Sequence, residues 1–408
     1  MICDGVVIGG GPAGMFAAIT AASLGQRVVL LERNDRLGKK LLITGKGRCN
    51  VTNNCSAQEV LNNVPCNSRF LYSAMHAFSP EDIISYFESH GCPLKTERGN
   101  RVFPLSDKSA SILNCLKAEL KTNGVTVLQD RALEICTKDH CVNVVRGEKS
   151  CYDCRWVILA TGGVSYPSTG STGEGYAIAE RLGHTIIPVE GSLVPLASDD
   201  PDCAAMQGLS LRNVGIQLLN SDEKLIYRDF GELLFTHFGV SGPTILSASA
   251  HLSGKDCKIL IDLKPALEEA KLDDRILRDL EKYRNRSMEN ALTDLLPRSM
   301  IPVVLRKLSI PSDLPAHSLR KEQRRALVVL LKSFPVPISA KRPVAEAIIT
   351  SGGVRTSEIN PKTMESKLIS GLYFAGEVID CDAYTGGFNL QIAWSTAYAA
   401  GMAVSNYH

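Results

Sequence analysis

Residues 6–33 read VVIGGGPAGMFAAITAASLGQRVVLLER, in which two apolar runs enclose a glycine-rich turn and a run of small residues. The run at 5–8 predicts a buried strand, because its apolar residues stop abruptly at a glycine. Residues 15–24 carry small and apolar side chains suited to a packed helix, and residues 27–31 predict a second strand. A strand, a helix and a second strand in this order predict a βαβ unit with parallel strands.

The turn after the first strand has the spacing G-x-G-x-x-G at Gly9, Gly11 and Gly14. In such a turn the first glycine permits the tight bend, the second lets the backbone approach a pyrophosphate, and the third lets helix and strand pack closely. Glu32 ends the second strand, where a carboxylate can accept hydrogen bonds from ribose hydroxyls. The stretch therefore predicts a bound dinucleotide, and a plain structural turn is the alternative. The residues predicted to contact the dinucleotide here are Gly9, Gly11, Pro12, Ala13, Gly14, Glu32 and Arg33.

The composition is that of an ordinary globular protein, with 408 residues, of which 44% are hydrophobic and 22% charged. The net charge of +2 predicts no general attraction to nucleic acids or to anionic membranes. The N-terminus leads straight into the first strand, so we expect no signal peptide, and no apolar run is long enough for a membrane helix. Thirteen cysteines without a secretion signal predict free thiols in a reducing, cytoplasmic compartment.

The sequence predicts no metal site. Cys151 and Cys154 form the only C-x-x-C pair, and no second pair follows at the spacing of a zinc site. The eight histidines show no H-E-x-x-H or comparable ligand spacing. Zinc or dithiol chemistry at the cysteine pair is therefore the weaker alternative.

A second glycine-rich, basic loop follows the βαβ unit closely and reads GKKLLITGKGRCNVTN over residues 38–53. Glycines let backbone amides face a phosphate, and lysine and arginine neutralise its charge. We expect this loop to contact the same ligand, and a solvated basic loop is the simpler alternative. The residues predicted to contact it are Lys40, Thr44, Gly45, Gly47, Arg48, Cys49 and Asn50.

This loop also carries a resemblance to a known family. The segment 38–53 is similar to the signature of a bacterial family of FAD-dependent oxidoreductases, which includes a 3-dehydro-bile-acid Δ4,6-reductase and an aminoacetone oxidase. Further similar segments are GNRVFP at 99–104, LFTHFGVSGP at 234–243 and the stretch 371–391. Many members of that family have glycine in place of Lys46 and tyrosine in place of Phe388. The resemblance spans essentially the whole chain and implies that the dinucleotide is FAD.

Three later segments resemble parts of flavoproteins. The predicted strand 156–159 runs into ATGG at 160–163, where many flavoprotein chains return to the FAD. The TGEG segment at 172–175 is similar to TGDG in flavoproteins of the fumarate reductase type. Near the C-terminus, TGGFNLQ at 385–391 opens a helix that in related flavoproteins points its N-terminal amides at the flavin ring. The residues predicted to contact FAD in these segments, and in FAGE at 374–377 at the end of a further predicted strand, are Thr161, Gly162, Gly376, Glu377, Gly386, Gly387, Asn389 and Leu390.

Dinucleotide elements lie at both ends of the chain, so residues 1–188 and 343–408 are predicted to build one Rossmann-like α/β domain that binds FAD. Short alternating strands, with turns at 220–222 and 253–255, predict an inserted β-rich domain over 189–265. Residues 266–342 predict a small helical domain. Its basic residues invite a nucleic-acid interpretation, but an apolar stripe favours a solvated helix face.

The resemblance implies a flavoenzyme, and we expect an NAD(P)H-driven reductase of a conjugated enone of the 3-dehydro-bile-acid or steroid type. Flavin N5 would deliver hydride to the β carbon, an acid would protonate the α carbon, and donors would hold the carbonyl oxygen. Since only one dinucleotide fingerprint is present, NAD(P)H would dock transiently as a co-substrate. The alternative is a flavin oxidase of a small amine such as aminoacetone. A flavin-bearing RNA-binding protein is disfavoured by the near-neutral charge and the lack of an aromatic and basic platform.

The candidate catalytic donors are Tyr384, His237, Tyr166 and Arg101. Tyr166 follows the flavin-side glycines, Tyr384 precedes the 385–387 turn, and His237 lies in the FTHFG loop of the predicted insertion. The resemblance implies a position near the flavin for Arg101. For each of the four, packing or a structural hydrogen bond is an equally good interpretation. We expect a small-molecule substrate and neither a nucleic-acid nor a membrane partner, while the oligomeric state stays open.

Overall fold

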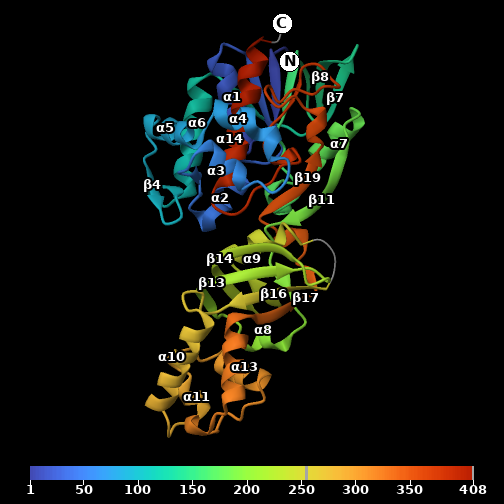
Figure 1. Ribbon diagram of the computed structural model, residues 1–408. Helices are drawn as coiled ribbons and strands as arrows, with labels where there is room; N and C mark the ends of the chain where they lie inside the picture. The colour runs from blue at the N-terminus through green and yellow to red at the C-terminus, as the bar shows by residue number, and fades with distance from the viewer. Residues whose placement is uncertain (253–255, 407–408) are drawn as a thin grey trace. The chain divides into compact units, whose positions relative to one another are not determined.

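The computed structural model describes residues 1–252 and 256–406, and the chain divides into two compact units. The first unit contains Met1–Ser192 and Val344–His408, and the second contains Leu193–Pro343. Segments from both ends of the chain therefore build the first unit together, as the blue and red ribbons of Figure 1 show. The turn predicted at 253–255 lies outside the described residues.

A parallel sheet of five strands forms the centre of the first unit, in the order β20-β10-β1-β2-β6. The strands are β1 (Gly5–Ile8), β2 (Val28–Glu32), β6 (Thr126–Gln129), β10 (Trp156–Leu159) and β20 (Leu372–Phe374). β1 lies in the middle, where Val6 pairs with Val157 on one side and with Val29 on the other. All four residues of β1 are buried, which explains why its sequence is continuously apolar. The predicted α/β fold of the Rossmann type is confirmed.

Two helices rich in small residues contact this sheet and each other, namely α1 (Pro12–Ser23) and α14 (Phe388–Ala403). They lie side by side in Figure 1, α1 in blue and α14 in red. Their close contact depends on Gly401, because an added Cβ there would lie 2.6 Å from the Cβ of Thr20. The first and last helices of the chain therefore share one hydrophobic core.

Three smaller antiparallel sheets belong to the first unit, with the strand orders β3-β5-β4, β7-β8-β9 and β11-β19. Their strands are β3 (Thr52–Asn53), β4 (Leu94–Glu97), β5 (Arg101–Pro104), β7 (Ala132–Lys138), β8 (Cys141–Gly147), β9 (Cys151–Asp153), β11 (Ile186–Ser192) and β19 (Ile349–Val354). The unit also contains the helices α2 (Lys39–Ile43), α3 (Ala57–Asn62), α4 (Tyr72–Ala77), α5 (Pro80–Ser89), α6 (Ser109–Thr122) and α7 (Glu174–Arg181). Helix α5 begins with a capping box between Ser79 and Asp82, which satisfies its first backbone amides.

The second unit contains a seven-stranded sheet in the order β17-β16-β13-β14-β15-β12-β18. Its strands are β12 (Leu196–Ala197), β13 (Ser210–Leu219), β14 (Leu225–Thr236), β15 (Gly239–Ser241), β16 (Cys257–Asp262), β17 (Phe334–Ile338) and β18 (Ala340–Lys341). Its helices are α8 (Pro201–Ala205), α9 (Pro243–Ser249), α10 (Glu269–Lys282), α11 (Met288–Ala291), α12 (Ile301–Lys307) and α13 (Lys321–Lys332). One hydrophobic cluster contains Ile259 of the sheet together with Ile276 and Leu327 of the helices. The predicted boundary between a β-rich and a helical domain stays a prediction.

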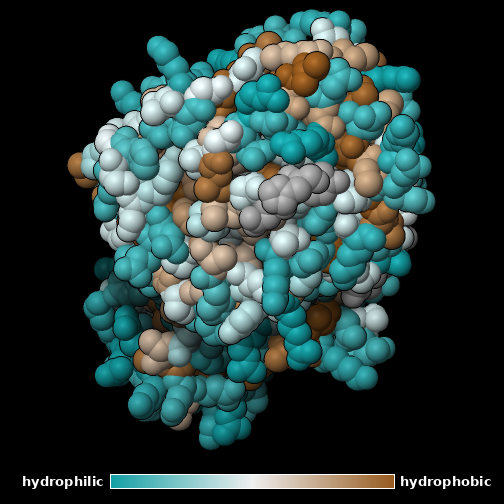
Figure 2. Space-filling model, turned by 90° about the horizontal axis from the view of Figure 1, so that it is seen from above, coloured by the Kyte–Doolittle hydropathy of each residue, from teal (hydrophilic) through white to brown (hydrophobic). Residues whose placement is uncertain are grey.

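The surface is mixed in polarity. Figure 2 shows, on the face seen from above, small groups of hydrophobic residues separated by hydrophilic ones. No helix within the described ranges is both long and apolar enough to cross a membrane.

A buried histidine in the first unit makes stability depend on pH. His184 Nε2 lies 2.9 Å from the hydroxyl of Ser366, and Nδ1 lies 3.3 Å from a carboxylate oxygen of Glu358. Burial lowers the pKa of His184 below the usual 6.5, although the neighbouring Glu358 opposes the shift. The folded state therefore holds the imidazole neutral at a pH where the unfolded chain already takes up a proton.

We expect the free energy of unfolding to fall as the pH drops from about 6.5 through the lowered pKa of His184, because only the unfolded state gains the proton first. His184→Gln, which cannot titrate, should show a shallower loss over the same pH range. Urea unfolding of both proteins at a series of pH values between 7 and 5 measures the difference. Parallel stability curves for the two proteins would contradict this assignment.

Candidate cofactor and active site

The turn between β1 and α1 has the geometry that its three glycines predict. Gly9 has φ of 110°, and an added Cβ would lie 2.4 Å from the carbonyl oxygen of Ala160. A Cβ on Gly14 would lie 1.8 Å from the carbonyl oxygen of Gly9, so the helix rests directly against the turn. A Cβ on Gly11 meets no atom within 4 Å. The backbone at Gly11 therefore has an open face, at the start of a helix that begins with Pro12.

Glu32 lies at the end of β2 and faces this turn. Its Oε2 accepts a 2.8 Å hydrogen bond from the amide of Gly10. Its Oε1 accepts two hydrogen bonds of 2.7 Å from Asn34, one from the amide and one from the side chain. A carboxylate has about four acceptor positions, so one on Oε2 is left for a hydroxyl group such as that of a ribose.

The second glycine-rich loop turns tightly. Gly45, Lys46 and Gly47 have φ angles of 57°, 58° and 83°. A left-handed conformation at Lys46 gives a physical reason why glycine is common at this position in the family that the loop resembles. The hydroxyl of Thr44 donates a 2.7 Å hydrogen bond to a main-chain carbonyl of its own turn. Cys49 is fully buried, and burial raises the pKa of its thiol to about 12, so the thiol stays protonated at neutral pH.

The two arginines predicted to contact the cofactor have carboxylate partners in the protein. Arg48 forms ion pairs of 2.5 Å with Glu97 and with Asp107. Arg33 forms an ion pair of 2.8 Å with Glu174, the acidic residue of the TGEG segment. These carboxylates offset much of the charge that would attract a phosphate. The predicted contacts of both arginines with the cofactor stay predictions.

Two polar atoms of the predicted cofactor segments are buried without a hydrogen-bond partner. Within the described part of the chain, Asn50 Oδ1 and Thr161 Oγ1 have no such partner. An unpaired buried polar group costs about 1–3 kcal/mol, and native proteins nearly always pair such groups. A polar ligand that contacts both segments would satisfy these two oxygens.

The C-terminal segment packs against the N-terminal loops at two glycines, Gly376 and Gly387. A Cβ on Gly376 would lie 2.8 Å from the Cβ of Ala13, in the first turn of α1. A Cβ on Gly387 would lie 2.5 Å from the carbonyl oxygen of Thr52. Both glycines have positive φ, 74° and 102°, which a residue with a side chain rarely adopts. The segment is therefore fitted closely against both glycine-rich loops.

Asn389 fixes the turn in front of α14. Its Oδ1 accepts a 2.8 Å hydrogen bond from the amide of Ala383, and its Nδ2 donates one of 2.7 Å to the carbonyl of the same residue. Gly386, with φ of 133°, lies in this turn, and Leu390 packs against the hydrophobic core. The first amides of α14 have no acceptor within the helix and give this end a partial positive charge. Such an end favours an anionic group.

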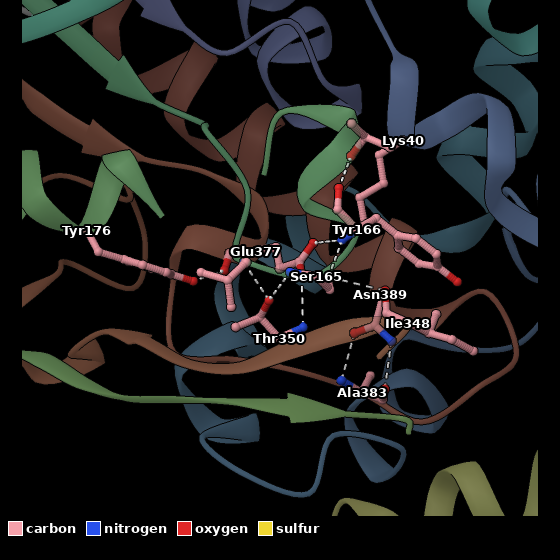
Figure 3. A network of polar contacts seen from close by, with 11 residues as sticks. Lys40, Ser165, Tyr166, Tyr176, Ile348, Thr350, Glu377, Ala383 and Asn389 are labelled. Carbon is pink, nitrogen blue, oxygen red and sulfur yellow. Dashed lines mark hydrogen bonds and ion pairs between the residues drawn. The ribbon is translucent and has the colours of Figure 1, made fainter. Parts of the chain in front are cut away.

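A polar network joins the second glycine-rich loop to two later segments (Figure 3). Lys40 Nζ lies 2.6 Å from Glu377 Oε2 and 2.7 Å from the hydroxyl of Ser165. The other carboxylate oxygen of Glu377 accepts hydrogen bonds of 2.9 Å from the Ser165 hydroxyl and from the amide of Thr350. The Lys40 and Glu377 side chains are only 19% and 13% exposed. Gly162, with φ of 74°, lies three residues before Ser165.

The four candidate donors have different surroundings. Tyr166 and Tyr384 belong to the first unit, and both are half-buried in loops that adjoin predicted cofactor residues. The amide of Tyr384 donates a 3.0 Å hydrogen bond to the carbonyl of Asn63. Arg101 is exposed on β5 and donates to a neighbouring main-chain carbonyl at 3.1 Å. His237 belongs to the second unit. The catalytic roles of all four stay predictions.

Three polar residues of this region were not predicted from the sequence, namely Asn34, Ser165 and Thr350. Asn34 supports Glu32, and its side chain also donates to the carbonyl of Thr169 at 3.1 Å. Thr350 is a fully buried polar residue in the strand β19. Thr350 directly follows the apolar pair Ile348–Ile349, and a polar residue at the end of an apolar run is the signal that the sequence did contain.

The residues present fit FAD. The open backbone at Gly11 suits a pyrophosphate, the spare acceptor of Glu32 suits a ribose hydroxyl, and the unpaired oxygens of Asn50 and Thr161 suit further polar groups of a long ligand. All of these residues lie in the first unit.

Known proteins with similar sequences and folds agree with this fit. The family model described as "HI0933-like protein Rossmann domain" matches residues 3–403. The 3-dehydro-bile acid delta(4,6)-reductase of Clostridium scindens is 33% identical over 98% of each chain. The ribosomal RNA dihydrouridine synthase of Escherichia coli is 31% identical, over 97% of this chain and 96% of its own. A flavocytochrome c3 fumarate reductase shares the fold with a TM-score of 0.51 at 16% identity, over 100% of this chain and 78% of its own. The chain therefore belongs to the HI0933-like family of FAD-dependent oxidoreductases with a Rossmann-type fold.

Proposed function

We propose that this protein is an NAD(P)H-driven, FAD-dependent reductase of a carbon–carbon double bond conjugated to a carbonyl group. The observation that supports it most is the pair of full-length relatives, 33% and 31% identical. The name of one describes reduction of the Δ4 and Δ6 bonds of a 3-oxo bile acid, and the name of the other describes formation of dihydrouridine from uridine. In both substrates the reduced bond is conjugated to a carbonyl.

FAD, when bound, supplies the hydride for this reaction. The chain itself holds the cofactor at the α1 turn and the Glu32 carboxylate, and orients it with the loop 38–53. The N-terminal amides of α14 stabilise negative charge that develops nearby. A side-chain donor supplies the proton for the carbon next to the carbonyl, and Tyr166 and Tyr384 are the candidates in the cofactor-binding unit.

We place a small-molecule enone of the 3-oxo-steroid type first among the substrates, because the relative that acts on one is 33% identical over 98% of each chain. Uridine in ribosomal RNA is the second candidate, favoured by the two dihydrouridine synthases of Escherichia coli and Haemophilus influenzae at 31% and 30% identity. The near-neutral net charge of +2 supports the small molecule.

Anaerobic half-reactions test the proposal. FAD-loaded protein is mixed with NADH or NADPH, and bleaching of the flavin absorbance is followed. The reduced protein is then mixed with a 4-en-3-one steroid, a 4,6-dien-3-one steroid, or ribosomal RNA transcribed in vitro. Return of the oxidised spectrum with a steroid product that has one carbon–carbon double bond fewer supports the steroid assignment, and dihydrouridine detected by mass spectrometry supports the RNA assignment. Bleaching by aminoacetone alone, without NAD(P)H, would replace the reductase with an oxidase.

A further inference from the structure

Tyr166 has an unusual backbone conformation. Its φ and ψ angles are 52° and 59°, in the left-handed region that side chains disfavour. Asn, Asp and His, which tolerate this region, make up half of the non-glycine residues with positive φ in the described chain. Tyr166 is the one tyrosine, phenylalanine or tryptophan among them. A bulky residue stays in this region only when its surroundings hold it there, and such residues concentrate at functional sites.

Hydrogen bonds fix the main chain on both sides of Tyr166. Before it, Ser165 is fully buried, and its amide donates a 3.2 Å hydrogen bond to the hydroxyl of Thr350. After it, the carbonyl of Tyr166 accepts hydrogen bonds of 2.8 and 2.7 Å from the amide and the hydroxyl of Thr169. The left-handed turn is therefore determined by Ser165 on one side and Thr169 on the other.

Lys40 completes the support on the Ser165 side. The Ser165 hydroxyl lies between Lys40 Nζ and a carboxylate oxygen of Glu377, at 2.7 and 2.9 Å, and Figure 3 shows these side chains converging next to Tyr166. A largely buried ion pair is a poor source of stability, because desolvation of the two charges offsets most of their attraction. The Lys40–Glu377 pair is better explained by its effect on geometry, because it fixes the position of the Ser165 hydroxyl.

The network is anchored at the cofactor-binding segments. Glu377 follows Gly376, which packs against Ala13 in the first turn of α1. A Cβ on Gly163 would lie 2.2 Å from the Thr350 hydroxyl and 2.9 Å from Glu377 Oε1, so the loop after β10 is pressed against the same network. The loop that leads to Tyr166 is therefore fixed against the cofactor-binding segments at Gly163, three residues before Tyr166.

We infer that Tyr166 is the general acid of this enzyme and that Lys40 is the positioning residue that holds it in place through Ser165 and Glu377. The inference rests on the proposed function. When hydride from reduced FAD forms a C–H bond at the β carbon, the electron pair of the double bond moves towards the carbonyl. The Tyr166 O–H bond then breaks as the proton bonds to the α carbon, and the phenolate takes a proton from solvent. A hydride from NAD(P)H, which carries both electrons, would restore reduced FAD and leave NAD(P)⁺.

The positioning role is tested without any substrate, by hydrogen–deuterium exchange of the FAD-loaded protein. We expect Lys40→Met to speed amide exchange in residues 163–170 by about 10-fold or more, because the turn loses one of its supports. Lys40→Arg keeps a cation for Ser165 and Glu377 and should restore most of the protection. Lys282→Met is the control, since Lys282 pairs with Asp294 at 2.8 Å in the second unit. Unchanged exchange in Lys40→Met would overturn the positioning role.

The acid role is tested with the acceptor that reoxidises the reduced wild-type protein. Tyr166→Phe should slow reoxidation by that acceptor by about 100-fold and leave flavin reduction by NAD(P)H within about 2-fold. Tyr72→Phe, at a tyrosine that is 55% exposed, is the control and should change neither step. A Tyr166→Phe protein that reoxidises at the wild-type rate would exclude the acid role.

The proposed function and the inference about Tyr166 are contradicted by different results. If no conjugated carbonyl compound reoxidises the wild-type protein, the proposed function is wrong and the acid role is wrong with it. The exchange experiment then still decides whether Lys40 fixes the Tyr166 turn. If the wild-type protein is reoxidised but Tyr166→Phe behaves like it, the proposed function stands and the inference about Tyr166 is wrong.

Discussion

Gly11→Val is expected to leave the apoprotein folded and to weaken FAD binding by at least about 100-fold, which corresponds to ~2.7 kcal/mol. The structure separates the two effects, because a Cβ on Gly11 meets no protein atom within 4 Å. Its φ of −79° is also one that valine adopts without strain. The added methyl groups occupy the face of the backbone that a pyrophosphate has to approach. The ratio of FAD to protein after purification and the melting temperature of the FAD-free protein measure the two effects.

Gly14→Val in the same turn is the matched control and should behave in the opposite way. Its Cβ would lie 1.8 Å from the carbonyl oxygen of Gly9, a backbone atom that cannot move aside without separating α1 from β1. We expect the apoprotein itself to lose ~3 kcal/mol or to fail to fold. A Gly11→Val protein that binds FAD normally would show that the pyrophosphate does not lie at this turn.

The cofactor-binding half of the fold could be predicted because its signals are local. The glycines at 9, 11 and 14 and the acid at 32 lie within one stretch, in which Gly14 packs against Gly9 and Glu32 accepts a hydrogen bond from Gly10. The same holds for the turn in front of α14, where Asn389 bonds to Ala383 six residues away. Patterns of this kind can be recognised in a single sequence.

The partners of the basic residues could not be predicted, because those partners lie far away in sequence. Arg48 meets Glu97 and Asp107, which follow it by 49 and 59 residues. Lys40 meets Glu377 across 337 residues. From the sequence alone each of these cations is a candidate ligand for phosphate, since a single sequence does not show which acids will lie opposite them. Only the tertiary fold decides which of these cations already have a carboxylate partner.

Glu377→Gln is expected to lower the free energy of unfolding by ~2–3 kcal/mol, because it leaves the Lys40 ammonium largely buried and without a counter-ion. The glutamine still offers an oxygen to the Ser165 hydroxyl and the Thr350 amide, so the loss reports on the charge. Lys40→Met alone should cost less, since the Glu377 carboxylate keeps those two donors at 2.9 Å. Urea unfolding of the FAD-free proteins measures all of these differences.

The double variant Lys40→Met/Glu377→Gln should recover most of the stability lost in Glu377→Gln, because neither residue then carries an uncompensated charge. The coupling free energy of the two substitutions is expected to be ~2 kcal/mol. Recovery of stability without recovery of slow amide exchange at 163–170 would separate the two roles of the pair, since the double variant lacks the cation that holds Ser165. Strictly additive losses would instead mean that Lys40 and Glu377 are not coupled in solution, and that the 2.6 Å contact between them does not hold the Tyr166 turn.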